Sequence, residues 1–203
     1  MRILVIGRGG REHAIVWALK QSAKVKQVYC APGNAGISRD AECVPIDEMD
    51  FAGIAQFAAD YSIDLVVVGP EAPLFAGIVD ALEEKNIPVF GPRKNAAEIE
   101  GSKVFAKQLM KKYGIPTAEY EAFDNVEEAL AYLRTKQAPI VIKADGLAAG
   151  KGVTVARTMA EAEAALREMM VGKVFGDAGN RVVIEEFLAG QEMSVLAFVD
   201  GEV

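Results

Sequence analysis

A glycine-rich segment in the second half of the chain carries the clearest chemical signal. The apolar run Ile140–Ile142 ends on Lys143, and a stretch of small residues follows that contains Gly146, Gly150 and Gly152. Glycine and alanine let the backbone approach triphosphate oxygens, and a lysine at a strand end can neutralise phosphate as a point charge. A P-loop would need Ser or Thr where Gly152 stands, so the segment predicts a phosphate-covering loop of another class. A flexible hairpin turn is the alternative, and the lysine at the inner end of the strand disfavours it.

A second strand-like run, Val182–Leu188, leads into a short hinge. A backbone C=O and N–H side by side at such a hinge can read the amino edge of adenine without a special side chain. Glu192 follows four residues later and is placed to accept hydrogen bonds from ribose hydroxyls. The alternative is that the glutamates of this run are only strand-end acids and that Phe187 and Leu188 belong to the core. The glycine loop upstream favours nucleotide binding.

Three glycines follow the first predicted strand, in the segment Gly7-Arg-Gly-Gly-Arg-Glu12. A strand that passes through glycines into a helix start is a generic anion site, because unpaired N–H groups and the helix dipole favour a phosphate. A dinucleotide fingerprint would need glycine at position 12, where Glu stands with no hydrophobic reason for it. The segment therefore favours a phosphate near Gly9, Gly10 and Arg11 over NAD, and a plain strand-to-helix connection is the alternative.

Another candidate side chain, Glu71, follows the strand predicted at Asp64–Val68. Ligands of open α/β sheets bind beyond the carboxyl ends of the strands. The Glu71 carboxylate can accept hydrogen bonds from a ribose hydroxyl or an amine there. An ordinary solvated loop acid is an equal alternative.

The elements that must position these groups change in character near residue 100. Before it, strands alternate with helices, which predicts βαβ units and an open parallel, Rossmann-like sheet over 1–101. The predicted elements are strands Ile3–Ile6, Val25–Ala31, Asp64–Val68 and Ile87–Phe90, and helices at Glu12–Lys20, around Phe51–Ala58 and at Phe75–Lys85.

From 102 to 203 the pattern predicts an incomplete α+β domain, mostly antiparallel, with a lid subdomain at about 117–186. Its expected strands are Thr117–Phe123, Pro139–Lys143, Val153–Ala156, Arg181–Phe187 and Glu192–Val199, and its expected helices are Ser102–Tyr113, one near Val126–Leu133, and one opened by Thr158 and Glu161 at capping-box spacing. Asp200-Gly201 is a hairpin signal with no returning strand, so we expect a fragment of a longer protein.

Composition excludes several classes of protein. The 203 residues are 51% apolar with a net charge of −7, and the chain has no basic stripe that would bind nucleic acid. No apolar run reaches the roughly 20 residues of a membrane span, and no signal peptide opens the chain. Cys30 and Cys43 are expected to be small buried side chains. We therefore expect a cytoplasmic protein.

Six blocks in order resemble the ATP-grasp superfamily and, within it, the glycinamide ribonucleotide synthetase (phosphoribosylamine–glycine ligase) family. Together they cover nearly the whole chain and are far more specific than any single block. They are Ile6–His13, Pro32–Gly36, Gly69–Leu74, Glu100–Lys107, Ile142–Val153 and Val183–Ser194.

The resemblance implies a role for each candidate residue. Lys103 and Lys143 would contact the ATP phosphates, and the loop Ala148, Ala149, Gly150, Lys151, Gly152 and Val153 would fold over them. Glu185 and Leu188 would read adenine through the backbone, with Glu186 and Phe187 in the same hinge, and Glu192 would hold the ribose. The loop around Gly9, Gly10 and Arg11, together with Glu71, would face phosphoribosylamine. No residue is expected to be catalytic, and His13, the only histidine, is expected to be structural.

The resemblance also implies the reaction. ATP would activate glycine as glycyl phosphate, and the amine of phosphoribosylamine would displace phosphate to give glycinamide ribonucleotide and ADP, in purine synthesis. Mg²⁺ or Mn²⁺ would assist, with ligands beyond residue 203. The partners would be these small molecules, and the protein would be a monomer or a weak dimer. A sister carboxylase and a Rossmann oxidoreductase or nucleotide sensor are the alternatives; the Arg-Glu-His run argues against the first and Glu12 against the second.

Overall fold

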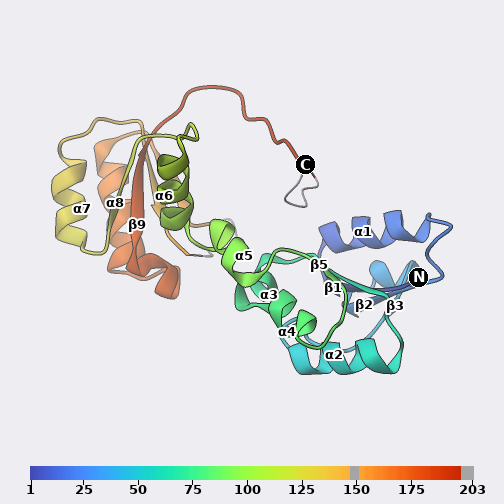
Figure 1. The fold of residues 1–203 in the computed structure, drawn as a ribbon. Helices are drawn as coiled ribbons and strands as arrows, with labels where there is room; N and C mark the ends of the chain where they lie inside the picture. Colours follow the sequence, from blue (N-terminus) through green and yellow to red (C-terminus); the bar gives the residue numbers. More distant parts are fainter. Residues whose placement is uncertain (147–150, 198–203) are drawn as a thin grey trace. The chain divides into compact units, whose positions relative to one another are not determined.

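The computed structural model describes residues 1–146 and 151–197. The chain divides into two compact units, Met1–Leu109 and Met110–Val203, and each is built on its own sheet (Figure 1). Within the described residues, no helix is both long enough and apolar enough to cross a bilayer.

The first unit contains a parallel sheet of five strands in the order β3-β2-β1-β4-β5. The apolar runs of the central strands are buried on both faces, as parallel sheets require, so the predicted parallel fold is confirmed. The strands are β1 (Arg2–Gly7), β2 (Gln27–Pro32), β3 (Glu42–Cys43), β4 (Leu65–Val68) and β5 (Val89–Phe90).

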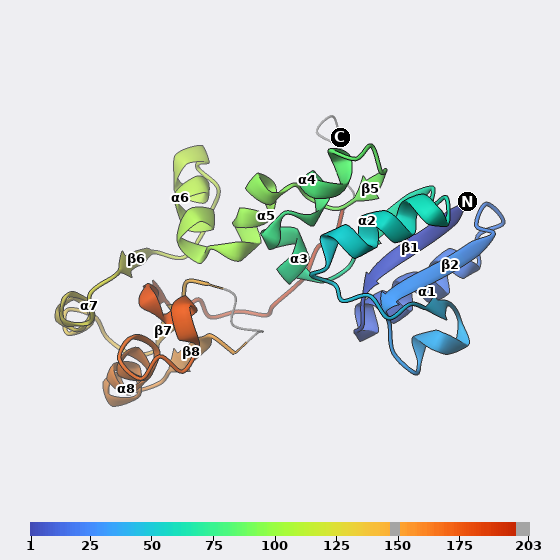
Figure 2. The ribbon, with the colours of Figure 1, turned by 90° about the horizontal axis from the view of Figure 1, so that it is seen from below.

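Helices cover both faces of this sheet. Helix α1 (Gly10–Lys20) packs Val16 against Ile3 and Val5 on one face. Helices α2 (Phe51–Asp60) and α4 (Ile78–Glu83) pack on the other face, against Leu4, Ile6 and Val66 among others. The view of Figure 1 shows α1 and α2 on opposite sides of the strands, and α2 lies in front of β1 when the unit is seen from below (Figure 2).

The helix predicted at Phe75–Lys85 is wrong as a single element. Helix α3 (Glu71–Ala76) ends at Gly77, and α4 begins directly after it. Gly77 has φ +98°, a left-handed conformation that ends a helix and that suits glycine. Glu71, expected in a loop, is the first residue of α3. The short strand β3, the 3₁₀ turn η1 (Ile37–Arg39) and helix α5 (Lys94–Gly101) were not predicted.

The second unit contains a four-stranded antiparallel sheet in the order β6-β9-β7-β8. The strands are β6 (Tyr120–Phe123), β7 (Ile140–Ala144), β8 (Val153–Ala156) and β9 (Val182–Glu186). Helices α7 (Val126–Leu133) and α8 (Met159–Met170) bury Leu130 and Leu166 against Ile142 and Ile184 on one face of the sheet. The Thr158 hydroxyl accepts a hydrogen bond from the N–H of Glu161, which confirms the predicted start of α8.

Two further segments connect these elements. Helix α6 (Lys103–Tyr113) ends before Gly114 at φ +67°, as its sequence predicts. The 3₁₀ turn η2 (Gly176–Asn180) lies between α8 and β9.

The strand predicted at Glu192–Val199 is absent over the part of it that the structure describes, 192–197. Met193, Val195 and Leu196 are each more than 80% exposed. A strand forms only where its N–H and C=O groups find a neighbouring strand, and alternation in the sequence cannot supply that neighbour. The hairpin signal Asp200-Gly201 lies outside the described residues.

The two cysteines are free thiols. Cys30 is buried as expected, and burial raises the pKa of its thiol to about 12. Cys43 is half-buried beside it in the register of β2 and β3.

Candidate functional site

The first candidate site lies at the carboxyl ends of β1 and β4. These strands are neighbours in the sheet although the chain visits β2 and β3 between them. Such a reversal of strand order is the topological switch point at which open α/β sheets bind ligands. The segments Gly7–Gly10 and Gly69–Glu71 therefore flank the crevice in which a ligand of this unit is expected.

Glu12 fills the space between these two segments. Only 3% of the residue is exposed, and its Oε2 accepts a hydrogen bond of 2.6 Å from the N–H of Gly9. A Cβ on Gly69 would lie 2.3 Å from Glu12 Oε1, and one on Gly7 would lie 2.6 Å from Glu12 Cγ. The sequence alone does not explain why Glu stands at position 12. The structure does, because the glycines at positions 7 and 69 leave room for its side chain.

Arg11 and Glu71 meet across the switch point. The Arg11 guanidinium donates to the Glu71 carboxylate at 2.8 Å, and both side chains are largely exposed. The hydrogen bond lowers the pKa of the Glu71 carboxyl and raises that of Arg11. Gly10 has open space around its Cα, whereas the N–H of Gly9 is already used by Glu12. Ligand binding by Gly9, Gly10, Arg11 and Glu71 stays a prediction, and Gly9 would have to take part through groups other than its N–H.

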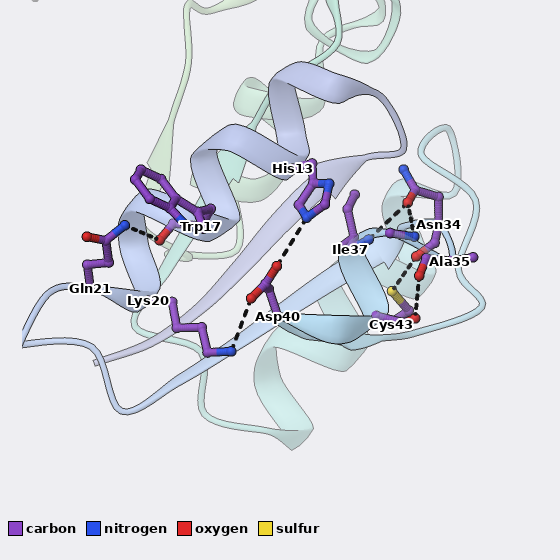
Figure 3. Close-up of polar contacts among 11 residues, drawn as sticks. His13, Trp17, Lys20, Gln21, Asn34, Ala35, Ile37, Asp40 and Cys43 are labelled. Carbon is purple, nitrogen blue, oxygen red and sulfur yellow. Dashed lines mark hydrogen bonds and ion pairs between the residues drawn. The ribbon is translucent and has the colours of Figure 1, made fainter.

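Asn34 holds the loop after β2 against the loop after β1. Its side-chain amide donates to the carbonyl of Arg8 at 2.7 Å. Its Oδ1 accepts from the N–H groups of Gly36 and Ile37, as Figure 3 shows for Ile37. This explains the turn-rich segment Pro32–Gly36 as a brace for the glycine loop.

His13, on α1, also contacts the segment that follows β2. Its Nε2 is 3.1 Å from Asp40 Oδ2, and Lys20 donates to the other oxygen of Asp40 (Figure 3). These two contacts lower the pKa of the Asp40 carboxyl. The arrangement supports a structural role for His13, because it ties α1 to the end of the following 3₁₀ turn.

The second candidate site lies on the face of the antiparallel sheet opposite α7 and α8. Lys143 of β7 donates to Glu185 of β9 at 2.7 Å, and only 5% of the Glu185 side chain is exposed. Val141 is the cross-strand partner of Glu185, so Lys143 and Glu185 are diagonal neighbours on one face. The sequence predicted only a backbone contact for Glu185. The alternation of β9, which puts Glu185 on the same face as Lys143, could have indicated the side-chain contact.

An exposed apolar strip lies beside this ion pair. Val153 and Val155 of β8 are the cross-strand partners of Lys143 and Val141, and each is nearly half exposed. An apolar surface next to a buried charge pair suits a flat, hydrogen-bonding aromatic group.

The hinge after β9 is open to solvent. Phe187 and Leu188 are 42% and 64% exposed, which contradicts the alternative that they are core residues. Glu186 is tied to Glu119, the residue before β6: its Oε1 accepts from the N–H of Glu119, and its own N–H donates to the carbonyl of Glu119. Glu192 is exposed.

The predicted phosphate loop is described only at its two ends. Ala148, Ala149 and Gly150 lie outside the described residues. Gly152 accepts a hydrogen bond from Ala144 through its carbonyl, and Val153 opens β8, with Lys151 exposed before them. Lys103 is the first residue of α6. Within residues 1–146 and 151–197, no three His, Cys, Asp or Glu side chains gather so that they could hold a metal ion.

The sheet and its two helices match the ATP-grasp class of fold. The profile of the phosphoribosylglycinamide synthetase ATP-grasp (A) domain matches residues 101–203, and that of the phosphoribosylglycinamide synthetase N domain matches residues 1–100. The chain therefore belongs to the phosphoribosylglycinamide synthetase family.

Relatives and solved structures agree with this assignment. A phosphoribosylamine–glycine ligase of Halalkalibacterium halodurans is 58% identical over 202 residues, which are 100% of this chain and 47% of that protein. The ligase of Escherichia coli K12 is 55% identical, over 48% of its length. The crystal structure of the Thermotoga maritima ligase has a TM-score of 0.77 at 37% identity, covering 94% of this chain and 45% of that one. The chain thus spans about half the length of the relatives it matches.

A biotin carboxylase of Campylobacter jejuni, in complex with a nucleotide, has a TM-score of 0.73 at 19% identity. The match covers 93% of this chain and 45% of the carboxylase, and it shows that the two proteins share the fold.

Proposed function

We propose that this chain is part of an ATP-dependent ligase that joins glycine to 5-phosphoribosylamine through glycyl phosphate. The products are glycinamide ribonucleotide, ADP and phosphate, in de novo purine synthesis. Family membership over the whole chain supports the substrates. The observation that carries the nucleotide part is the Lys143–Glu185 pair beside an exposed apolar strip and an open hinge. Because the chain spans about half of its relatives, we expect it to be inactive alone.

ATP is proposed to lie along the exposed β8 edge of the sheet face opposite α7 and α8. Adenine packs on Val153 and Val155 and is read by the backbone of the hinge Glu185–Leu188, while Glu192 accepts from the ribose. Lys143 and Lys103 neutralise the phosphates, and the loop 148–153 covers them. The protein contributes position and charge, which are the main terms in phosphoryl transfer.

Phosphoribosylamine is proposed to bind at the switch point of the first unit, against Gly9, Gly10, Arg11 and Glu71. Its amine is itself the nucleophile, so no protein nucleophile is needed. The domains are proposed to divide at 101/102, with the lid at about 117–186. A cytoplasmic monomer or weak dimer that binds neither nucleic acid nor membrane completes the proposal.

Mg²⁺ or Mn²⁺ is the proposed metal. When bound, it neutralises charge on the ATP phosphates. By the family resemblance, its ligands are expected in the part of the relatives that this chain does not span. A biotin carboxylase domain of Hydrogenobacter thermophilus, which shares the fold at 21% identity and a TM-score of 0.70, was crystallised with MgADP.

The full-length enzyme that contains this chain is expected to form ADP only when glycine and phosphoribosylamine are both present. Each substrate alone, and bicarbonate in place of glycine, serves as a control in a coupled ADP assay. ADP formation with bicarbonate would indicate a sister carboxylase and would overturn the proposal.

The change Lys143→Ala is expected to weaken ATP binding by about 1.5–3 kcal/mol, the range for a charge-assisted contact. Titration calorimetry on the folded variant measures this, and Lys111→Ala, an exposed lysine of α6, is the matched control. Equal ATP affinity in Lys143→Ala and the control would remove Lys143 from the nucleotide site.

A further inference from the structure

The start of α1 has the features of an anion site. Helix α1 is 11 residues long, begins after Gly9 at the switch point, and directs its first N–H groups toward the crevice. With glycine at position 12, the segment would read G-x-G-x-x-G, the pattern that holds a pyrophosphate.

A carboxylate of the protein occupies this place instead. Glu12 Oε2 accepts the hydrogen bond of the Gly9 N–H. Glu12 Oε1 lies against Gly69, so close that a Cβ added there would be only 2.3 Å from it. Oε1 is buried and accepts no hydrogen bond within the described residues, with Arg11 Nε at 4.0 Å. The turn therefore carries a fixed negative charge that solvent hardly screens.

The arginines near this turn already have other carboxylate partners. Arg8 pairs with Asp47 at 3.2 Å and with Glu48 at 3.5 Å, and Arg11 pairs with Glu71 at 2.8 Å. Each guanidinium thus already has a carboxylate partner, so neither arginine is a free cation for a phosphate that enters the turn beside Glu12.

We propose that Glu12 is a specificity-determining residue: its carboxylate keeps anionic groups out of the β1–α1 turn and reserves the turn for the uncharged or cationic end of a ligand. A sugar phosphate then binds with its hydroxyl or amine end toward Glu12 and with its phosphate elsewhere. Naming that end as the amine of phosphoribosylamine rests on the proposed function, whereas the exclusion of anions does not.

Glu12→Gln tests the proposal, because glutamine keeps the length of the side chain and an oxygen for the Gly9 N–H but removes the charge. Inorganic pyrophosphate is titrated into the 203-residue chain at constant ionic strength, and the amide signals of Gly9, Gly10 and Arg11 are followed by NMR. Glu84→Gln, an exposed residue after α4, makes the same change in net charge and is the control. Glu12→Met, of similar length, repeats the test if Glu12→Gln does not fold.

Glu12→Gln is expected to lower the dissociation constant of pyrophosphate at these amides about tenfold or more, as removal of a like charge a few Å away predicts. The wild-type chain and Glu84→Gln should show no saturable shift of the Gly9 amide. Saturable pyrophosphate binding at Gly9 in the wild type, or equal affinities in Glu12→Gln and Glu84→Gln, would overturn the proposal. If the ADP assay contradicts the proposed ligase reaction, the pyrophosphate result still stands, because it tests only the exclusion of anions.

Discussion

Replacing Lys143 by methionine is expected to lower the free energy of unfolding of the second unit by about 3 kcal/mol. The change removes the Lys143 ammonium, which lies 2.7 Å from a Glu185 carboxylate that is only 5% exposed. Breaking a buried ion pair costs roughly 3–5 kcal/mol, and the Lys143 side chain is 26% exposed, so the lower end applies. Urea denaturation followed by circular dichroism measures the loss.

The double variant Lys143→Met/Glu185→Leu separates the pair from other effects of the mutation. Removing both charges means that no buried carboxylate loses the Lys143 charge, so this variant should be much closer to the wild type than Lys143→Met. Lys111→Met, on the exposed surface of α6, should change stability by less than about 0.5 kcal/mol. A single variant as stable as the Lys111 control would show that the pair does not hold β7 and β9 together.

Gly69→Ala is expected to destabilise the first unit by about 3 kcal/mol, the upper end of the range for overpacking. The new methyl group would lie 2.3 Å from Oε1 and 2.6 Å from Cγ of Glu12, whose side chain is enclosed and cannot move aside freely. Thermal or urea unfolding of the variant tests this expectation.

Gly10→Ala is the matched control, since a Cβ at Gly10 would meet nothing within 4 Å. It should be close to neutral. Adding Glu12→Ala to Gly69→Ala removes the clash, so the two changes should be less costly together than the sum of their single effects. Equal costs for Gly69→Ala and Gly10→Ala would contradict the packing of Glu12 described above.

The sequence predicted the elements that local pattern determines. Continuous apolar runs such as Leu65–Val68 are typical of strands buried on both faces, and Thr158 with Glu161 marks the start of α8. The strand predicted at 192–199 is absent over 192–197, the part of it that the structure describes, because a strand depends on a neighbouring strand and not only on its own alternation. The break at Gly77 was missed because a glycine within a helical pattern is often tolerated.

The candidate sites were predicted only where they depend on local pattern. Lys143, Glu71 and the glycine loops follow from their positions at strand ends. The side-chain roles of Glu12 and Glu185 depend on contacts with residues more than 40 positions away, Gly69 for the first and Lys143 for the second. Such contacts require the sheet order and the strand register, which one sequence does not specify.

The fate of the glycine oxygens tests the proposed reaction most directly. The full-length enzyme is supplied with ATP, phosphoribosylamine and glycine labelled with ¹⁸O in its carboxylate, and the released phosphate is examined by mass spectrometry. If glycyl phosphate forms, the carboxylate oxygen that attacks the γ-phosphorus leaves with phosphate when the amine forms the amide bond. One ¹⁸O in each phosphate is therefore expected for every ADP formed, and ADP formation with unlabelled phosphate would contradict the proposed function.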